Sequence, residues 1–122
     1  MIKKIEKPSV NFTFPIFNHD KFFYDDSSKE YFFKTRYESL IYFNLNGEVH
    51  RKNKPAIIYL DGAYRYYNNN KLHRIDGYAT YDKFYFYFYI NGDLYNSKLF
   101  AENTDHLICD NCKTFCKQVC FF

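Results

Sequence analysis

A turn signal that recurs every 22 or 23 residues limits what this chain can fold into. Gly47, Asn70 and Gly92 occupy equivalent points, and an aromatic, strand-like run precedes each of them. A period of this length corresponds to one β-hairpin per repeat, and a single hairpin cannot bury its own hydrophobic face. We therefore expect a mainly β fold, an antiparallel meander of stacked β-hairpin repeats of about 22–23 residues each.

The composition also indicates a sheet. Of 122 residues, 14 are Tyr and 15 are Phe, and none is Trp. Aromatic side chains favour the half-buried surface of a sheet, and the Asn, Asp and Gly runs between them are typical of tight turns. Strand or hairpin patterns cover residues 21–33, 37–45, 55–60, 63–67, 78–82 and 84–90.

The pattern divides the chain into three parts. Residues 1–20 are expected to form an extended, irregular N-terminal arm, because Pro8 and Pro15 interrupt regular structure. Residues 21–96 carry the hairpin repeats. Residues 97–122 lose the repeat pattern and are predicted to form a short helical, cysteine-containing cap over the open end of the sheet, with Ser97 as the N-cap.

The run FYFYFYI at 84–90 alternates two aromatic residue types. The phenylalanines are Phe84, Phe86 and Phe88, and the tyrosines are Tyr85, Tyr87 and Tyr89. In a strand the two sets face opposite sides, so we expect the phenylalanines in the core and the tyrosines on a wetter face. The alternative is that the tyrosines form a stacking platform for single-stranded nucleic acid.

Residues 42–106 resemble a known type of repeat, Tyr-x-Asn-Gly-x-x-His-Arg-x-Asp-Gly-Pro-Ala. The resemblance is carried by NGEVHRKNKPAIIYLDGAYRYYNNNKLHRIDGYATYDKFYFYFYINGDLYNSKLF. Such repeats occur in uncharacterised proteins of large bacteriophages, giant DNA viruses and some bacteria, and are similar in style to MORN-repeat variants. The first copy has Lys52-Asn53-Lys54 in place of Asp-Gly, and the second has Tyr78 in place of Pro. The resemblance implies stacked antiparallel hairpins and a viral or phage setting, and it implies no established activity.

The repeated pairs His50-Arg51 and His73-Arg74 have three possible interpretations. An alanine, Ala56 or Ala79, follows five residues after each arginine. In a structural one, each arginine lies over a Tyr ring and each histidine caps a turn carbonyl. In a binding one, the His/Arg column contacts phosphate or carboxylate on a partner. In a catalytic one, a histidine acts as general base. No Ser, Cys or acidic residue recurs at fixed spacing beside both pairs, so we favour the structural interpretation and expect no enzymatic activity.

Four cysteines, Cys109, Cys112, Cys116 and Cys120, follow His106 near the C-terminus. On one helix they would form a stripe about 16 Å long, which is too long for one tetrahedral zinc ion. A zinc site would require a chain reversal in this segment. Buried thiols, disulfides within or between chains, and zinc therefore stay open as alternatives, and no other cofactor is expected.

The excess of positive charge is small, with 17 Lys and Arg against 14 Asp and Glu and a formal net charge of +3. A dedicated nucleic-acid-binding protein usually has a stronger basic field. No apolar stretch reaches the length of a membrane span, and no hydrophobic segment of a signal peptide follows the first lysines. We expect an intracellular location, in the host cytoplasm, or a place in a virus particle.

Together these features predict a non-enzymatic structural or protein-interaction module, viral in origin, that binds a protein partner or itself and takes part in a particle or larger assembly. The alternative is a nucleic-acid-binding protein whose tyrosines stack on bases. Its basic strip would consist of Arg51, Lys52, Lys54, Arg65, Lys71 and Arg74.

Overall fold

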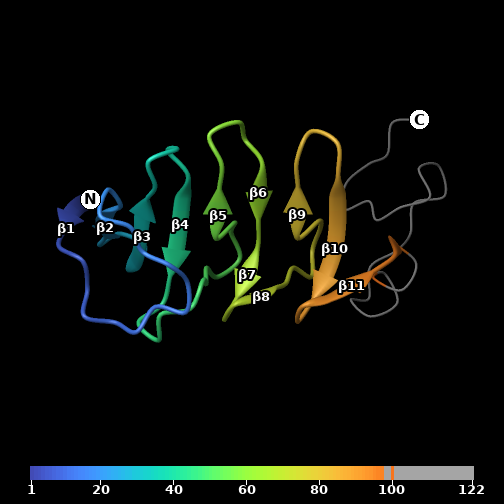
Figure 1. Cartoon of the computed structure of the whole chain (residues 1–122). Helices are drawn as coiled ribbons and strands as arrows, with labels where there is room; N and C mark the ends of the chain where they lie inside the picture. The colour runs from blue at the N-terminus through green and yellow to red at the C-terminus, as the bar shows by residue number, and fades with distance from the viewer. Residues whose placement is uncertain (98–99, 101–122) are drawn as a thin grey trace.

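The structure is a computed structural model that describes residues 1–97 and Phe100. Its main sheet has nine strands in the order β1-β2-β3-β4-β5-β6-β9-β10-β11, and β7 and β8 form a separate two-stranded ribbon. Figure 1 shows the strands standing side by side as a ladder that follows the order of the chain. The strands are β1 (Ile2–Ile5), β2 (Lys21–Asp25), β3 (Glu30–Lys34), β4 (Leu40–Phe43), β5 (Ile57–Ile58), β6 (Tyr64–Arg65), β7 (Tyr67–Asn68), β8 (Lys71–Leu72), β9 (Thr80–Tyr81), β10 (Phe86–Ile90) and β11 (Asp93–Tyr95).

The predicted antiparallel meander of hairpins is confirmed, because every strand pair in both sheets is antiparallel. Equivalent residues of the two copies also make equivalent hydrogen bonds. The Tyr42 N–H donates to the Ala56 carbonyl and the Tyr66 N–H to the Ala79 carbonyl, each at 2.7 Å. Both alanines are completely buried. A larger side chain at either position would therefore have no space at the point where neighbouring hairpins meet.

The three equivalent turns lie at the lower edge of the ladder in Figure 1. Gly47, Asn70 and Gly92 have φ angles of 78°, 70° and 87°. These angles are left-handed, and Gly and Asn are the residues that adopt them most readily. The residues before Asn70 and Gly92 also have positive φ, as in the two-residue turns that match the twist of a hairpin.

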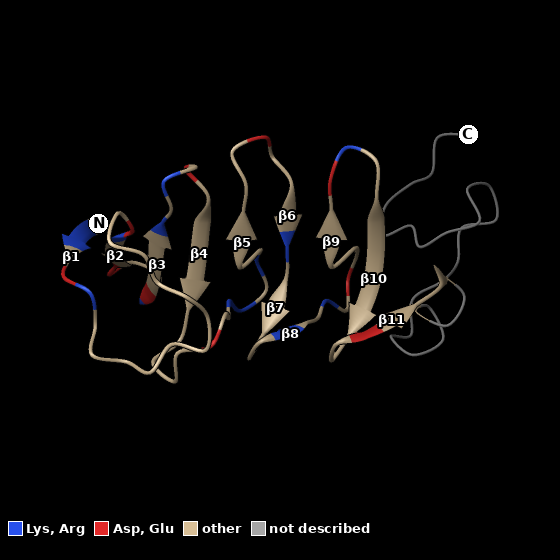
Figure 2. Cartoon of the chain, in the orientation of Figure 1, with Lys and Arg blue, Asp and Glu red and all other residues tan. Residues whose placement is uncertain are grey.

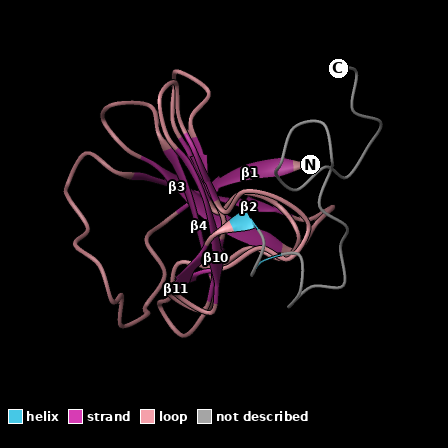
Figure 3. Ribbon diagram, turned by 90° about the vertical axis from the view of Figure 1, so that its right-hand side faces the viewer, coloured by secondary structure: helices cyan, strands magenta, loops and turns pink. Residues whose placement is uncertain are grey.

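Alternate side chains of the strands point to opposite faces of the sheet, and each face has its own core. Phe22, Phe33 and Phe43 cluster on the face that the N-terminal arm covers, which we call the arm face. Phe32, Tyr42 and Ala56 cluster on the opposite face, which we call the loop face. Figure 3 looks along the sheet and shows connecting loops on both sides of the stacked strands.

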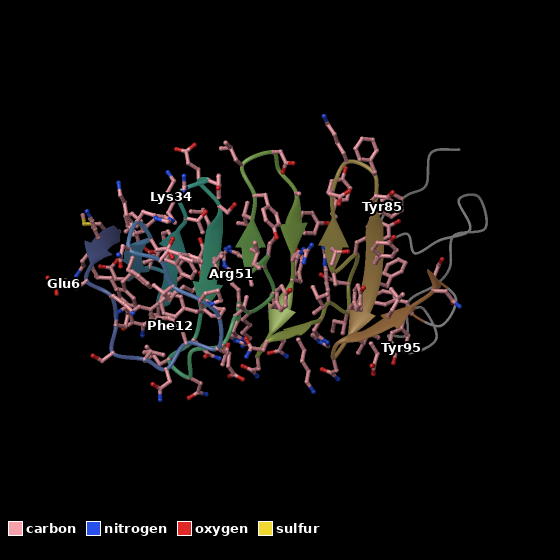
Figure 4. The ribbon with its side chains drawn as sticks, in the orientation of Figure 1. Glu6, Phe12, Lys34, Arg51, Tyr85 and Tyr95 are labelled. Carbon is pink, nitrogen blue, oxygen red and sulfur yellow. The ribbon has the colours of Figure 1, made fainter. Side chains whose placement is uncertain are left out.

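Part of the N-terminal arm forms a strand, although its sequence predicts an irregular segment. Its first residues form β1, which pairs with β2 so that Ile5 lies opposite Phe22. Pro8, which has no N–H to donate, follows the end of this strand. The rest of the arm crosses the arm face, where Phe12 and Phe14 pack against the core (Figure 4). The strand was missed because the pairing partner, β2, is distant from it in sequence.

The expectation for the run 84–90 is wrong for two of the three phenylalanines. Phe84 is 79% exposed and Phe86 is 52% exposed, whereas Phe88 is 5% exposed. Phe84 lies in the turn before β10, and its N–H donates to the Asp82 carboxylate. Phe88 is buried because the Phe100 ring stacks on it at 4.3 Å, so burial follows local coverage of the sheet and not strand alternation alone.

Most of the predicted helical cap, residues 97–122, lies outside the described residues. At its start, the Phe100 N–H donates to the Asn96 carbonyl at 2.9 Å. Within the described part of the chain, no helix has the length and apolar character needed to cross a membrane.

Candidate functional site

The two repeated histidines connect each hairpin to the next one. The His50 Nδ1 accepts a hydrogen bond from the Asn69 N–H at 3.1 Å, and the His73 Nδ1 accepts one from the Asn91 N–H at 3.0 Å. A ring nitrogen that accepts carries no proton, so the neutral ring holds its proton on Nε2. The histidines therefore bind turn amides, and not the turn carbonyls that the sequence led us to expect.

The two repeated arginines lie over tyrosine rings. The Cζ atom of Arg51 is 3.8 Å from the centroid of the Tyr42 ring, and that of Arg74 is 4.2 Å from the Tyr66 centroid. A guanidinium at this distance is attracted by the negative face of the ring. Burial raises the pKa of both tyrosines, and the charge of the arginine partly opposes this rise. Each pair thus packs a charged group and an aromatic ring between neighbouring hairpins.

Each of these arginines also has a carboxylate partner, but the two copies obtain it differently. The Arg74 Nε donates to Asp76 at 2.7 Å, within the same loop. The first copy has Asn53 at the position equivalent to Asp76, and the Arg51 Nε instead donates to Glu30 of β3 at 3.0 Å. Glu30 therefore replaces the acid that the first copy lacks. Sequence reasoning missed this residue because it lies outside the repeat.

The Arg side chains also close the loops that follow them. The Arg51 Nη1 donates to the Pro55 carbonyl at 3.3 Å, and the Arg74 Nη1 donates to the Tyr78 carbonyl at 3.0 Å. Both acceptors are four residues after the arginine and directly precede the buried alanines. The substitution of Tyr78 for the expected Pro leaves this contact intact, because only the backbone carbonyl is used. Figure 4 shows Arg51 in the space between β4 and β5.

The structure brings the four predicted His and Arg residues to one groove of about 700 Å³, which we call the His–Arg groove. Among the described residues that line it there is no Ser, Thr or Cys. The described lining therefore offers N–H donors, charged groups and the phenol hydroxyls of Tyr66 and Tyr67, but no Ser or Thr hydroxyl and no Cys thiol. Its other lining residues are Lys52, Asn53, Tyr66, Tyr67, Asn68, Ile75 and Asp76.

The three predicted tyrosines line a different and larger groove of about 960 Å³, which we call the tyrosine groove. The Tyr85 and Tyr87 rings are nearly parallel, at 6°, with centroids 6.4 Å apart. Figure 4 shows Tyr85 beside the upper end of β10. Further lining residues that the sequence did not single out include Tyr37, Tyr59, Arg65, Thr80 and Tyr81.

The tyrosine groove lies on the arm face, beyond the part that the arm covers. Residues paired across neighbouring strands share a face. One row of paired residues crosses the sheet from buried Phe33 to Tyr87. Its members in order are Phe33, Ile41, Ile57, Arg65, Thr80 and Tyr87. Tyr89 lies on the same side of β10 as Tyr87 by alternation. Tyr85 directly precedes β10 and lines the same groove.

Four residues of the predicted basic strip are divided between the two grooves. Arg51, Lys52 and Arg74 line the His–Arg groove, whereas Arg65 lines the tyrosine groove. In Figure 2 the basic and acidic positions are spread along the ladder. Among the described residues, the charged side chains that line the tyrosine groove are Arg65, Asp61 and Asp82, one positive and two negative groups.

The predicted metal or disulfide candidates His106, Cys109, Cys112, Cys116 and Cys120 lie outside the described residues. Within residues 1–97 and at position 100, no group of three or more His, Cys, Asp or Glu side chains is placed to hold a metal ion. Comparison of the chain with protein-family models finds no match, and neither does comparison with curated proteins or with solved structures.

Proposed function

We propose that the chain is a non-enzymatic protein-interaction module whose binding surface is the tyrosine groove. The observation that carries this proposal is a change of residue type along the arm face. Where the arm covers the sheet, the fully buried aromatic side chains are Phe22, Phe33 and Phe43, with Tyr31 partly buried beside them. Beyond the arm, the same face presents tyrosines, of which Tyr85 is 60% and Tyr87 is 43% exposed.

Tyrosine suits a surface that is alternately wet and covered. Its ring adds apolar contact area at the cost of ordering only two side-chain torsions, and its hydroxyl can bond either water or a partner. Tyr is enriched in the centres of protein interfaces for these reasons. A phenylalanine at the same exposed position would have no hydroxyl to bond water or a partner.

The His–Arg groove supports the non-enzymatic part of the proposal. The Nδ1 atoms of both histidines accept hydrogen bonds from backbone amides, and both arginines lie between a tyrosine ring and a carboxylate. The same arrangement recurs in both copies. Such contacts are what a repeated hairpin needs to stack on its neighbour, so they account for the repeated His-Arg pairs without a catalytic role.

For the biological setting we propose a phage or giant-virus protein that belongs to a particle or larger assembly. The support for this part is the resemblance of the repeats to those of such viruses, together with the stacked hairpins that the resemblance implies.

Nucleic-acid binding is the second candidate, since parallel tyrosine rings can stack bases. The charge of the tyrosine groove does not favour it. Its described lining has one arginine and two aspartates, and single-stranded nucleic acid requires a positive surface along its phosphates.

Selection from a random peptide library tests the proposed function. The double variant Tyr85→Ala/Tyr87→Ala removes two rings from the groove. The double variant Phe84→Ala/Phe86→Ala removes two rings from neighbouring, exposed positions that do not line it. We expect the wild type and the phenylalanine variant to enrich the same peptides, and the tyrosine variant to lose them. If no peptide depends on the tyrosines, the tyrosine groove is not a protein-binding surface.

A further inference from the structure

The tyrosine groove continues to the edge of the N-terminal arm. A second hollow, of about 410 Å³, lies between them and shares Tyr37, Ser39 and Tyr59 with the groove. Its other side is formed by Phe17 and His19 of the arm. Phe17 is 57% exposed although its ring stacks on the His19 ring. A path lined mainly by aromatic and aliphatic side chains, with Arg36 and Asp20 also in the hollow, therefore runs along the arm face from the end of the arm to β10.

The arm shows what kind of segment this face accepts. Phe12, Phe14 and Ile16 pack onto the core, while the residues between them are exposed. The Phe12 ring is 5.1 Å from the Phe43 ring, and the Phe14 ring is 5.6 Å from the Phe33 ring. This in-and-out pattern has a period of two, as in any extended chain lying on a flat surface. Extended backbone with alternating apolar side chains thus suits the arm face.

The open part of the face carries charged side chains beside its tyrosines. Arg65 lies 6.0 Å from the centroid of the Tyr59 ring. Asp61 and Asp82 lie at the upper turns of the ladder, where acidic positions are visible between β5 and β6 and beside β9 (Figure 2). Each carboxylate accepts backbone N–H bonds through Oδ1, which keeps it fixed at the rim. A ligand with basic groups at one side complements this excess of negative charge.

We propose that the ligand of the tyrosine groove is an extended peptide segment of a partner protein, with apolar side chains at alternate positions and at least one Lys or Arg at its end. The inference rests on the proposed function and adds the class of partner to it. The alternating side chains lie against the tyrosines, the tyrosine hydroxyls bond the peptide backbone, and the basic group lies near Asp61 and Asp82. The segment ends against Phe17 and His19, where the chain's own arm begins to cover the face.

Three synthetic peptides test this ligand class by fluorescence anisotropy. The first has the sequence of residues 8–18 of the chain followed by two lysines, the second has two aspartates in place of the lysines, and the third is a scrambled form of the first without alternation. We expect the lysine peptide to bind about tenfold more tightly than either of the others, which corresponds to roughly 1.4 kcal/mol. Equal binding of all three overturns the proposal.

The two double variants locate the bound peptide. Tyr85→Ala/Tyr87→Ala should weaken the lysine peptide by about tenfold or more, as expected when rings are removed from the centre of a binding surface. Phe84→Ala/Phe86→Ala should leave the affinity within about twofold, since those side chains do not line the groove. Circular dichroism establishes that both variants are folded. If the peptide binds equally to the tyrosine variant, it has displaced the arm from the phenylalanine core, and the proposal is wrong.

An oligothymidylate of twelve nucleotides and cellohexaose serve as competitors. Displacement of the lysine peptide by either compound at lower concentration than unlabelled peptide would assign the groove to nucleic acid or carbohydrate and overturn the proposal. One further outcome distinguishes the class of peptide from the interaction function. If library peptides depend on the tyrosines but lack alternation and basic residues, the peptide class is wrong while the interaction function stands.

Discussion

The contact between Gly47 and the arm can be tested by a single added methyl group. A Cβ atom at Gly47 would lie 1.9 Å from the Asn11 carbonyl oxygen and 2.9 Å from the Phe12 Cα. Both are backbone atoms, so the clash can be relieved only by moving the arm. The Thr13 N–H donates to the Gly47 carbonyl at 2.9 Å, and this bond would be lost with the movement. We therefore expect Gly47→Ala to detach the arm from the sheet.

The loss of stability follows from what the arm covers. Alanine at positive φ costs about 1–2 kcal/mol by itself. Loss of the Thr13 hydrogen bond adds about 1 kcal/mol. Re-exposure of the half-buried Phe12 and Phe14 rings adds about 1–1.5 kcal/mol each, half the value for full burial. We expect Gly47→Ala to lower the free energy of unfolding by about 4–6 kcal/mol in total, a large share of the 5–15 kcal/mol of a typical domain.

Gly62→Ala is the matched control, because Gly62 has a φ of 92° but no atom within 4 Å of the added Cβ. It carries the backbone cost without the clash, so it should lose only about 1–2 kcal/mol. Urea unfolding followed by circular dichroism gives both values, and hydrogen exchange at the Thr13 amide reports on the arm directly. If the two variants differ by less than about 1 kcal/mol, or if the Thr13 amide stays protected in Gly47→Ala, the arm does not depend on this glycine.

Three further contacts give predictions of their own. A double-mutant cycle of Arg51→Met and Tyr42→Leu should yield a coupling free energy of about 0.5–2 kcal/mol, and a value near zero would mean that the stacked pair does not stabilise the fold. His73→Leu removes the acceptor of the Asn91 N–H, so exchange of that amide should accelerate about tenfold while His73→Gln, which keeps an acceptor, should restore part of the protection. Hydrogen bonds from the Phe84 and Tyr85 amides lower the pKa of Asp82 below its ordinary 3.8. The pKa of Asp82 is lower in the folded protein than in the unfolded chain, so this stabilisation is present above the pKa of the unfolded chain and is lost as the pH falls through the pKa of the folded protein. Carboxyl NMR titration should show the low pKa, and Asp82→Asn should reduce the acid sensitivity of unfolding.

The hairpin repeats could be predicted because their signals are local. Gly47, Asn70 and Gly92 mark the turns through backbone angles that few residues adopt, and Ala56 and Ala79 mark the tight approach of neighbouring hairpins. These requirements act within one repeat and recur in the next. The repeat spacing therefore predicts which residues occupy equivalent places.

The remaining features depend on contacts between distant segments. Glu30 replaces the missing acid of the first copy from outside the repeat, 21 positions before Arg51. Exposure of Phe84 and Phe86 depends on what covers the loop face beside β10, which alternation alone cannot predict. The tyrosine groove likewise combines residues from 37 to 89. Sequence spacing identified Tyr85, Tyr87 and Tyr89 as one set but could not place Arg65 and Tyr59 beside them.

The equivalent bonds between hairpins make the width of this protein adjustable. Each copy packs on its neighbour through equivalent backbone hydrogen bonds and an equivalent His-Arg pair. Each copy also contributes two strands to the main sheet. At about 4.8 Å between strands, one inserted copy would widen the ladder by roughly 10 Å without a new kind of contact. Gain or loss of a single copy would thus change the distance between the two ends by a fixed step, as in a molecular ruler, while the arm at one end stays in place.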